Sequence, residues 1–153
     1  MITAFAILLG GCLAAPSAHT PTQPSDSANV VGVVLGFHAA LASGDSLAAL
    51  GFLDPDAIIL ESGAAETREE YRLHHLPADI EFARTVKSKP SILRVSLSGN
   101  VAWVASTSIS RGRFARRQIS SAGAELIVLR RAASGWKIAA IHWSSRALPR
   151  PTG

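Results

Sequence analysis

Hydrophobic and polar positions follow two different periods along this chain, and the period changes near residue 90. Between Val30 and Leu41 the apolar residues recur at steps of three and four, the spacing of one buried face of an α-helix. From Pro90 onward apolar and polar residues alternate, as they do in strands that bury one face. Helices followed by a series of such strands predict an α+β fold rather than a parallel α/β fold.

The helical part should contain more than one element. Ser27 or Asn29 can cap the first helix, which is expected to stop at residues 43–45. A second short helix is predicted around residues 46–52, followed by a turn at residues 54–56. Residues 57–61 are then expected to form a short strand.

A further helix start is encoded by Thr67-Arg68-Glu69-Glu70, which has the pattern of a capping box. In this motif the Thr67 hydroxyl and the Glu70 carboxylate each accept a hydrogen bond from the other's backbone N–H. Pro77 is expected to end or bend the helix that begins here, because proline lacks the N–H that a helix interior needs. Residues 79–84 can form one more helical turn.

The second half of the chain predicts antiparallel strands joined by short turns. Gly99-Asn100 and residues 133–135 are the turn signals. Residues 111–118 are either a polar connection or an extension of the strands beside them. The expected strands cover residues 90–98, 101–110, 125–131 and 136–144.

Several segments, taken in order, resemble the nuclear-transport-factor-2-like superfamily and its SnoaL-like branch. The similarity covers about residues 28–146 and includes the leading helix, the helix start at residues 67–71, Gly99-Asn100-Val101-Ala102-Trp103-Val104, Gly135-Trp136-Lys137-Ile138 and His142-Trp143-Ser144. The resemblance implies a conical barrel, in which a curved, mainly antiparallel sheet wraps over about three N-terminal helices and encloses a pocket. It also implies, for many members, a homodimer formed through the outer face of the sheet.

The N-terminus predicts export and a lipid anchor. Residues 4–11 form an apolar run too short to span a bilayer but long enough for a signal-peptide core. The run ends in Leu9-Gly10-Gly11-Cys12, the pattern of a bacterial lipoprotein signal in which Cys12 is acylated. Residues 1–12 are therefore interpreted as the signal, 13–27 as a flexible Pro/Ser/Thr tether, 28–146 as the domain and 147–153 as a disordered tail. The alternative is a buried strand that happens to contain a cysteine.

Composition narrows the possible functions. The chain has 153 residues, one cysteine and a formal charge of +4, with basic and acidic residues interleaved. A single cysteine excludes an internal disulfide framework, and scattered charges do not predict a nucleic-acid surface. No Walker loop, dinucleotide-binding glycine motif or zinc-protease motif occurs. No cofactor and no metal are expected.

Candidate chemistry centres on His142 in the last strand. Strict alternation puts His142 on the same face as Trp136 and Ile138, which make the better core face. His142 is then expected to point into the pocket, where an imidazole could act as a general base. The opposite face, with Ile141 and Trp143, would suit a dimer interface. The simpler interpretation is a buried histidine with a backbone or hydroxyl partner.

A base needs further groups to orient it and to stabilise developing charge. Asp79 could orient the imidazole and Tyr71 could donate a hydrogen bond to an oxyanion, which completes the predicted catalytic set with His142. The pocket is expected to be lined by Trp103, Trp136, His74 and His75. A metal site formed by His75, Asp79 and His142 is conceivable, but histidines at a helix end are the simpler interpretation.

Three functional hypotheses follow. The leading hypothesis is an exported domain, held on the periplasmic or extracellular side of the cell envelope, that binds a small and largely apolar molecule. The first alternative is a cofactor-free isomerase, cyclase or dehydratase with His142 as general base. The second is a structural dimerisation module that uses the outer sheet face.

Overall fold

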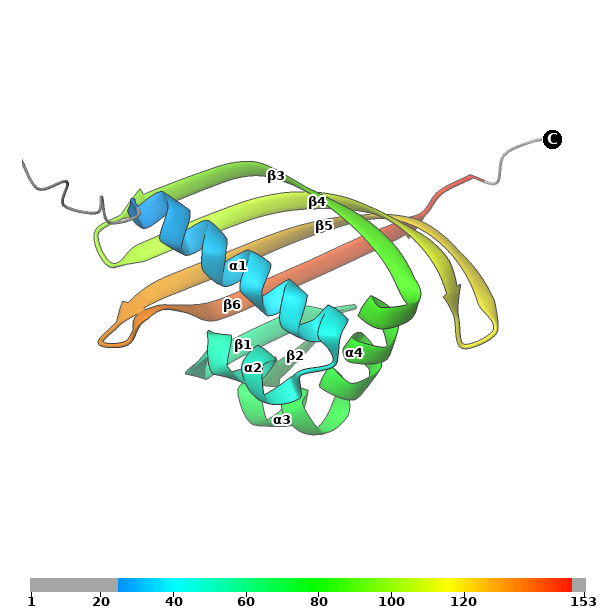
Figure 1. Ribbon diagram of the computed structural model, residues 1–153, viewed down its shortest axis with the longest axis horizontal. Helices are drawn as coiled ribbons and strands as arrows, with labels where there is room; N and C mark the ends of the chain where they lie inside the picture. The colour runs from blue at the N-terminus through cyan, green and yellow to red at the C-terminus, as the bar shows by residue number, and fades with distance from the viewer. Residues whose placement is uncertain (1–24, 150–153) are drawn as a thin grey trace, which may run out of the picture.

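The computed structural model describes residues 25–149, which form a curved six-stranded sheet with helices on its concave side (Figure 1). The strand order is β2-β1-β6-β5-β4-β3, and the pairing is antiparallel except between β1 and β6. The helices are α1 (Asp26–Ser43), α2 (Ser46–Phe52), α3 (Arg68–His74) and α4 (Leu76–Thr85). The strands are β1 (Leu53–Glu61), β2 (Ala64–Thr67), β3 (Val86–Ser98), β4 (Val101–Phe114), β5 (Arg117–Ala132) and β6 (Gly135–Ala147). The predicted α+β class, with a mainly antiparallel curved sheet, is confirmed.

Local sequence signals set the ends of α1. The side chain of Ser25 accepts a hydrogen bond from the Ala28 N–H, so Ser25 is the cap rather than Ser27 or Asn29. The helix therefore begins at Asp26, two residues before the expected start of the domain. It ends where Gly44 adopts a left-handed conformation with φ of 82°, which costs glycine little because it lacks a Cβ.

The predicted capping box forms at the start of α3. The Glu70 N–H donates to the Thr67 hydroxyl at 3.2 Å, and the Thr67 N–H donates to a Glu70 carboxylate oxygen at 2.8 Å. The helix that starts at this capping box ends at His74, before Pro77, as predicted, but Pro77 does not end the helical region as a whole. It lies in the first turn of α4, where its missing N–H is not needed, and α4 is a ten-residue helix rather than a single turn.

The strands are longer than the sequence pattern indicates. Residues 111–118 are strand extensions of β4 and β5 around a tight turn in which Ala115 and Arg116 have positive φ values. Strand β2, which was not predicted, pairs with β1 after a turn at Ser62-Gly63. Strand β6 reaches Ala147, the first residue of the expected tail, and the Leu148 N–H donates to the Ser120 carbonyl.

The hydrophobic core lies between α1 and one half of the concave sheet face. Val30, Val34, Phe37 and Leu41 of α1 are buried there, together with Tyr71 of α3 and aliphatic residues of the sheet. Figure 1 shows α1 running diagonally under the strands while the β4–β5 hairpin continues past it and curves over. A T-shaped contact between the rings of Phe82 on α4 and Phe114 on β4 joins this hairpin to the helices.

A β-bulge in β6 overturns the predicted assignment of faces on that strand. Val128 pairs with Ala140 while Leu129 pairs with Ile138, so Ala139 is the extra residue and the alternation shifts by one. Trp136 and Ile138 point inward before the bulge, as expected. After it Ile141 is fully buried and Trp143 packs against the core, whereas His142 is exposed. The prediction that Ile141 and Trp143 form the outer face is therefore wrong.

Candidate functional site

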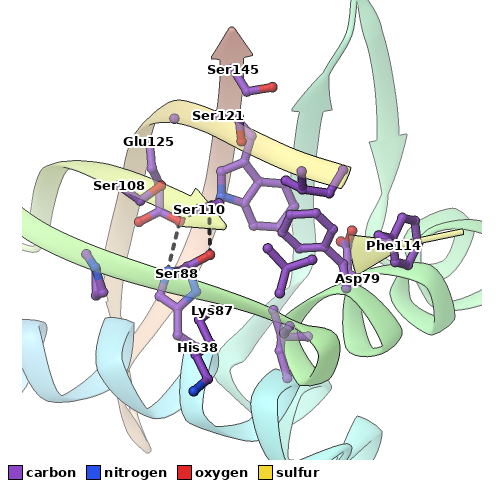
Figure 2. Close-up of a pocket in the computed structure, with 18 of the residues that line it drawn as sticks. His38, Asp79, Lys87, Ser88, Ser108, Ser110, Phe114, Ser121, Glu125 and Ser145 are labelled. Atoms are coloured by element: carbon purple, nitrogen blue, oxygen red, sulfur yellow. Dashed lines mark hydrogen bonds and ion pairs between the residues drawn. The ribbon is translucent and has the colours of Figure 1, made fainter. Parts of the chain in front are cut away.

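A cavity of about 1030 Å³ lies where the sheet extends beyond the core. One side is formed by the C-terminal part of α1 and by α4, and the other by the far ends of β3, β4, β5 and β6 (Figure 2). The helical side contributes mainly small and apolar groups, among them Ala42, Ala78, Phe82 and Ala83. The sheet side is polar, so the two walls differ in chemistry.

The polar wall follows from the register of the sheet. Side chains directly across neighbouring strands lie in rows on one face. The first row contains Ser88, Ser110 and Ser121, the second Ser108, Gly123 and Ser145, and the third Ser106, Glu125 and Trp143. All of these residues line the cavity, and we name their six serines, Ser88, Ser106, Ser108, Ser110, Ser121 and Ser145, the hydroxyl wall.

Glu125 on β5 is the most fully bonded charged group of the cavity. Its Oε2 accepts from His38 Nε2 at 2.9 Å and from Trp143 Nε1 at 2.7 Å, and its Oε1 accepts from the Ser106 hydroxyl at 2.9 Å. Burial raises the pKa of Glu125, but these hydrogen bonds outweigh burial and hold the pKa below its ordinary value. Glu125 is therefore ionised at neutral pH and positions the His38 imidazole at the cavity wall (Figure 2).

Asp79 on α4 is the second carboxyl group of the cavity, and its environment acts in the opposite direction. Burial raises the pKa of Asp79 to about 6, although the Tyr71 hydroxyl donates to Asp79 Oδ2 at 2.9 Å and lowers it; Glu61 nearby raises it further. The same burial and the neighbouring Asp79 raise the pKa of Tyr71, whose side chain is fully buried. The Tyr71 hydroxyl thus fixes the position of the Asp79 carboxyl group, but Tyr71 does not itself line the cavity.

Two of the three carboxyl groups that line the cavity, Glu125 and Asp79, therefore differ in proton affinity. Glu125 stays ionised, whereas Asp79 can gain and lose a proton close to neutral pH. Environments that separate the pKa values of two neighbouring acids are a frequent basis for dividing roles between them. Chemically, this arrangement keeps a fixed negative charge at Glu125 and can move a proton at Asp79.

Solved structures of other proteins are similar to this chain in both sequence and fold. A protein from Shewanella frigidimarina, described as a proposed ketosteroid isomerase, is 31% identical over 78% of this chain and 98% of its own, with a TM-score of 0.73. The chain belongs to the nuclear-transport-factor-2-like, ketosteroid-isomerase-like family.

Two more distant structures have the same fold. A ketosteroid isomerase-like protein from Erwinia carotovora is 20% identical, with 81% of this chain and 98% of that one covered and a TM-score of 0.65. A proposed dehydratase of the NTF2-like family from Streptomyces avermitilis is 17% identical, with the same coverage and a TM-score of 0.67. No family model and no curated protein matches the sequence.

Within this NTF2-like domain the predicted catalytic residues are only partly brought together. Tyr71 and Asp79 are hydrogen-bonded to each other, and Asp79 lines the cavity. His142 lies on the opposite face of the sheet, between Leu126 of β5 and Leu60 of β1, because of the bulge at Ala139. The expectation that His142 points into the pocket is therefore not met.

The predicted pocket tryptophans also lie outside this cavity. Trp103 is on the outer sheet face, with the guanidinium of Arg94 over its ring at 5.7 Å. Trp136 is buried under Arg131 and borders a separate, smaller hollow between α1, α2 and the β5–β6 turn. The prediction that Trp136 points to the inner face of the sheet is correct, but the cavity lies farther along that face.

His74 and His75 face solvent at the end of α3. The Nδ1 atoms of both rings approach the carboxylate of Glu66, His75 at 2.6 Å and His74 at 3.3 Å. The Glu66 hydrogen bond raises the pKa of His75. Both histidines lie on the surface and do not line the cavity. Among residues 25–149 no three histidine, cysteine, aspartate or glutamate side chains are grouped so that they could hold a metal ion.

Sequence reasoning missed Glu125 and the hydroxyl wall as parts of the site. The signal for Glu125 is present, because it is two and four residues before Ile127 and Leu129 and so shares their inward face. A carboxylate on the buried face of a strand requires partners, and His38 is one of them. Cys12, the predicted lipidation site, lies outside the described residues.

Proposed function

We propose that this NTF2-like domain, whose sequence pattern resembles SnoaL-like proteins, binds a small organic molecule in the cavity between α1, α4 and the hydroxyl wall. The observation that carries the proposal is the cavity itself, whose volume of about 1030 Å³ is at the upper end of typical ligand sites. Its apolar helical wall would bury the hydrocarbon part of a ligand. Its polar groups, Glu125, His38 and Asp79, would fix the orientation.

Filling the cavity tests this proposal. Nile red, an uncharged dye that fluoresces in apolar surroundings, should bind the wild-type protein. The variant Ser121→Trp, which places an indole in the cavity, should weaken binding by about tenfold or more, whereas Ser91→Trp on the exposed part of β3 should not. Equal binding by both variants, with both folded by circular dichroism, would refute a ligand site at this cavity.

A second candidate function is proton transfer on the bound molecule. Asp79 favours it, because a carboxyl group with a pKa of about 6 can act as a base near neutral pH. On a β,γ-unsaturated ketone, the carboxylate would remove a proton from the carbon between carbonyl and double bond. It would return that proton to the far carbon of the double bond, leaving the conjugated ketone. The descriptions of similar proteins as ketosteroid isomerases or isomerase-like, and of one as a dehydratase, support testing this reaction.

The enzymatic candidate is tested with a β,γ-unsaturated ketosteroid, followed by the absorbance of the conjugated product. Asp79→Asn should lower kcat by about 100-fold or more, while Glu81→Gln on the exposed side of α4 should not. Because the carboxylate must be ionised, kcat/KM should rise as the pH passes through about 6. Unchanged turnover by Asp79→Asn would eliminate Asp79 as the base.

We also infer that the outer face of the sheet forms a homodimer. Ile58, Leu60 and Leu126 are exposed there, by 47%, 38% and 41%, and Leu60 and Leu126 flank His142. Exposed apolar side chains gathered on one face of a sheet favour association. Leu126→Arg should convert the dimer into a monomer in light scattering; a monomeric wild-type protein would contradict the inference.

Export and lipid anchoring remain predictions from the N-terminal sequence. An acylated Cys12 would hold the domain at the cell envelope, because each buried methylene contributes about 0.8 kcal/mol of membrane affinity. In bacterial cells producing the full chain, Cys12→Ala should move the protein from the membrane fraction to the soluble fraction. A variant that stays in the membrane fraction would show that Cys12 is not the anchor.

A further inference from the structure

The hydroxyl wall offers more hydrogen-bonding groups than the protein itself uses. The Ser106 hydroxyl donates a hydrogen bond to Glu125, and the hydroxyls of Ser88 and Ser110 are hydrogen-bonded to each other at 2.7 Å. Across residues 25–149, no protein group hydrogen-bonds to the hydroxyls of the remaining three, Ser108, Ser121 and Ser145, all of which line the cavity (Figure 2). Each hydroxyl can both donate and accept, so these three groups are available to a ligand.

The charges of the cavity restrict what that ligand can be. Glu125 is ionised, and Glu61 and Asp79 are two further carboxyl groups in the lining. The same lining contains three basic side chains, Arg84, Lys87 and Arg146. Because acidic and basic groups are equal in number, the lining has no large net charge that would favour an anion or a cation. Glu125 already accepts from three protein donors, which leaves it little capacity to hold a cation. A neutral ligand with several hydroxyl groups satisfies the wall without adding charge.

Aromatic rings complete the set of groups that such a ligand needs. Trp143 lies beside the polar rows, and Phe82 and Phe114 close the opposite end of the cavity through their ring contact. The C–H faces of a saturated ring can pack on aromatic and aliphatic groups while its hydroxyls point to a polar wall. Gly123 contributes space, because a Cβ at this position would lie 2.8 Å from the Ser108 hydroxyl oxygen.

We propose that the cavity binds a neutral, polyhydroxylated ring, such as the sugar ring of a glycoside, with its hydroxyls on Ser108, Ser121 and Ser145. This inference rests on the proposed ligand-binding function and specifies the ligand class. It differs from the expected largely apolar ligand. A molecule with few oxygens would leave the three hydroxyls of the wall without partners once water was displaced, which is unfavourable.

A matched pair of ligands tests the proposal. Phenyl β-D-glucopyranoside and phenyl tetrahydropyranyl ether share the same ring system, but the ether lacks the hydroxyl groups. In competition with Nile red, the glucoside should bind about tenfold more tightly than the ether, as expected from one or two net hydrogen bonds. The proposal is overturned if the ether competes as well as the glucoside or better.

Serine variants test whether the hydroxyl wall causes the difference in affinity between the glucoside and the ether. Replacing Ser108, Ser121 and Ser145 together by alanine should weaken the glucoside about tenfold and leave the ether unchanged, whereas Ser91→Ala should affect neither. The proposal also fails if this triple variant binds the glucoside as the wild type does. If Nile red binds in the cavity but neither competitor displaces it, the sugar-ring proposal is wrong and ligand binding stands. If Nile red does not bind there, both are wrong.

Discussion

The inner face of the sheet has two regions that share strands and alternation but differ in chemistry. In the region under α1, the sheet contributes a set of apolar, buried inward residues from β4, β5 and β6: Ala102, Val104, Ile127, Leu129, Ile138 and Ile141. A few residues farther along the same strands, the inward positions belong to the hydroxyl wall and Glu125. The inward face alone therefore does not define the core; coverage by a helix does.

The difference separates the part of the inward face that packs from the part that lines the cavity. Aliphatic residues gain stability only where another element excludes water from them. Beyond α1 the inward face of the strands lines the cavity instead of packing closely on that helix, and serine there avoids an exposed apolar surface while keeping space free. The polar region is thus a consequence of strands that are longer than the helices that cover them.

The largest expected effect comes from a substitution in the apolar region. Ile127 is fully buried between β4, β6 and the helices, so Ile127→Ala removes packed atoms and leaves a void. We expect the free energy of unfolding in urea to fall by about 2–5 kcal/mol. A loss below about 1 kcal/mol would mean that this part of the sheet is not the core.

The next effect concerns the carboxyl group of Asp79. Its pKa is raised from 3.8 to about 6 on folding, so the folded protein binds this proton more tightly than the unfolded chain. This contribution to stability is complete below about pH 4 and is lost as the pH rises through about 6. Asp79→Asn should therefore be more stable than wild type at pH 7.5, by as much as about 3 kcal/mol, but not at pH 4.

Urea denaturation at the two pH values measures this difference. Glu81→Gln, an exposed substitution on the same helix, serves as the control and should follow the wild-type pH dependence. If Asp79→Asn and wild type differ equally at both pH values, the carboxyl group is not held in the environment described here.

The smallest effect comes from the polar region itself. Ser108 packs against little and has no protein partner within the described chain, so Ser108→Ala should change the free energy of unfolding by less than about 0.5 kcal/mol. Urea denaturation alongside Ile127→Ala makes the contrast direct. A loss comparable to that of Ile127→Ala would remove the distinction between the two regions.

Much of the fold could be predicted because its signals are local. The capping box at Thr67 and the αL position at Gly44 depend on residues next to each other in sequence. The position of His142 could not be predicted, because the bulge at Ala139 depends on how β6 pairs with β5 and leaves no clear mark in the sequence. One inserted residue reverses every side chain after it.

The site was predictable only in part for the same reason. Tyr71 and Asp79 were identified from a helical segment and lie together. The pairing of His38 with Glu125 joins positions 87 residues apart, and only the packing of α1 on the sheet brings them within 2.9 Å. The serines alternate as strand residues should, but whether a helix covers them is a tertiary property.

The three tryptophans allow one measurement to test whether the polar region is the ligand site. Trp143 lines the cavity, Trp103 lies on the outer face and Trp136 borders the separate hollow. In nitrogen–proton NMR spectra recorded during titration with phenyl β-D-glucopyranoside, the indole signal of Trp143 should shift while those of Trp103 and Trp136 stay in place. A shift at Trp103 or Trp136 with Trp143 unmoved would contradict a ligand site at the hydroxyl wall.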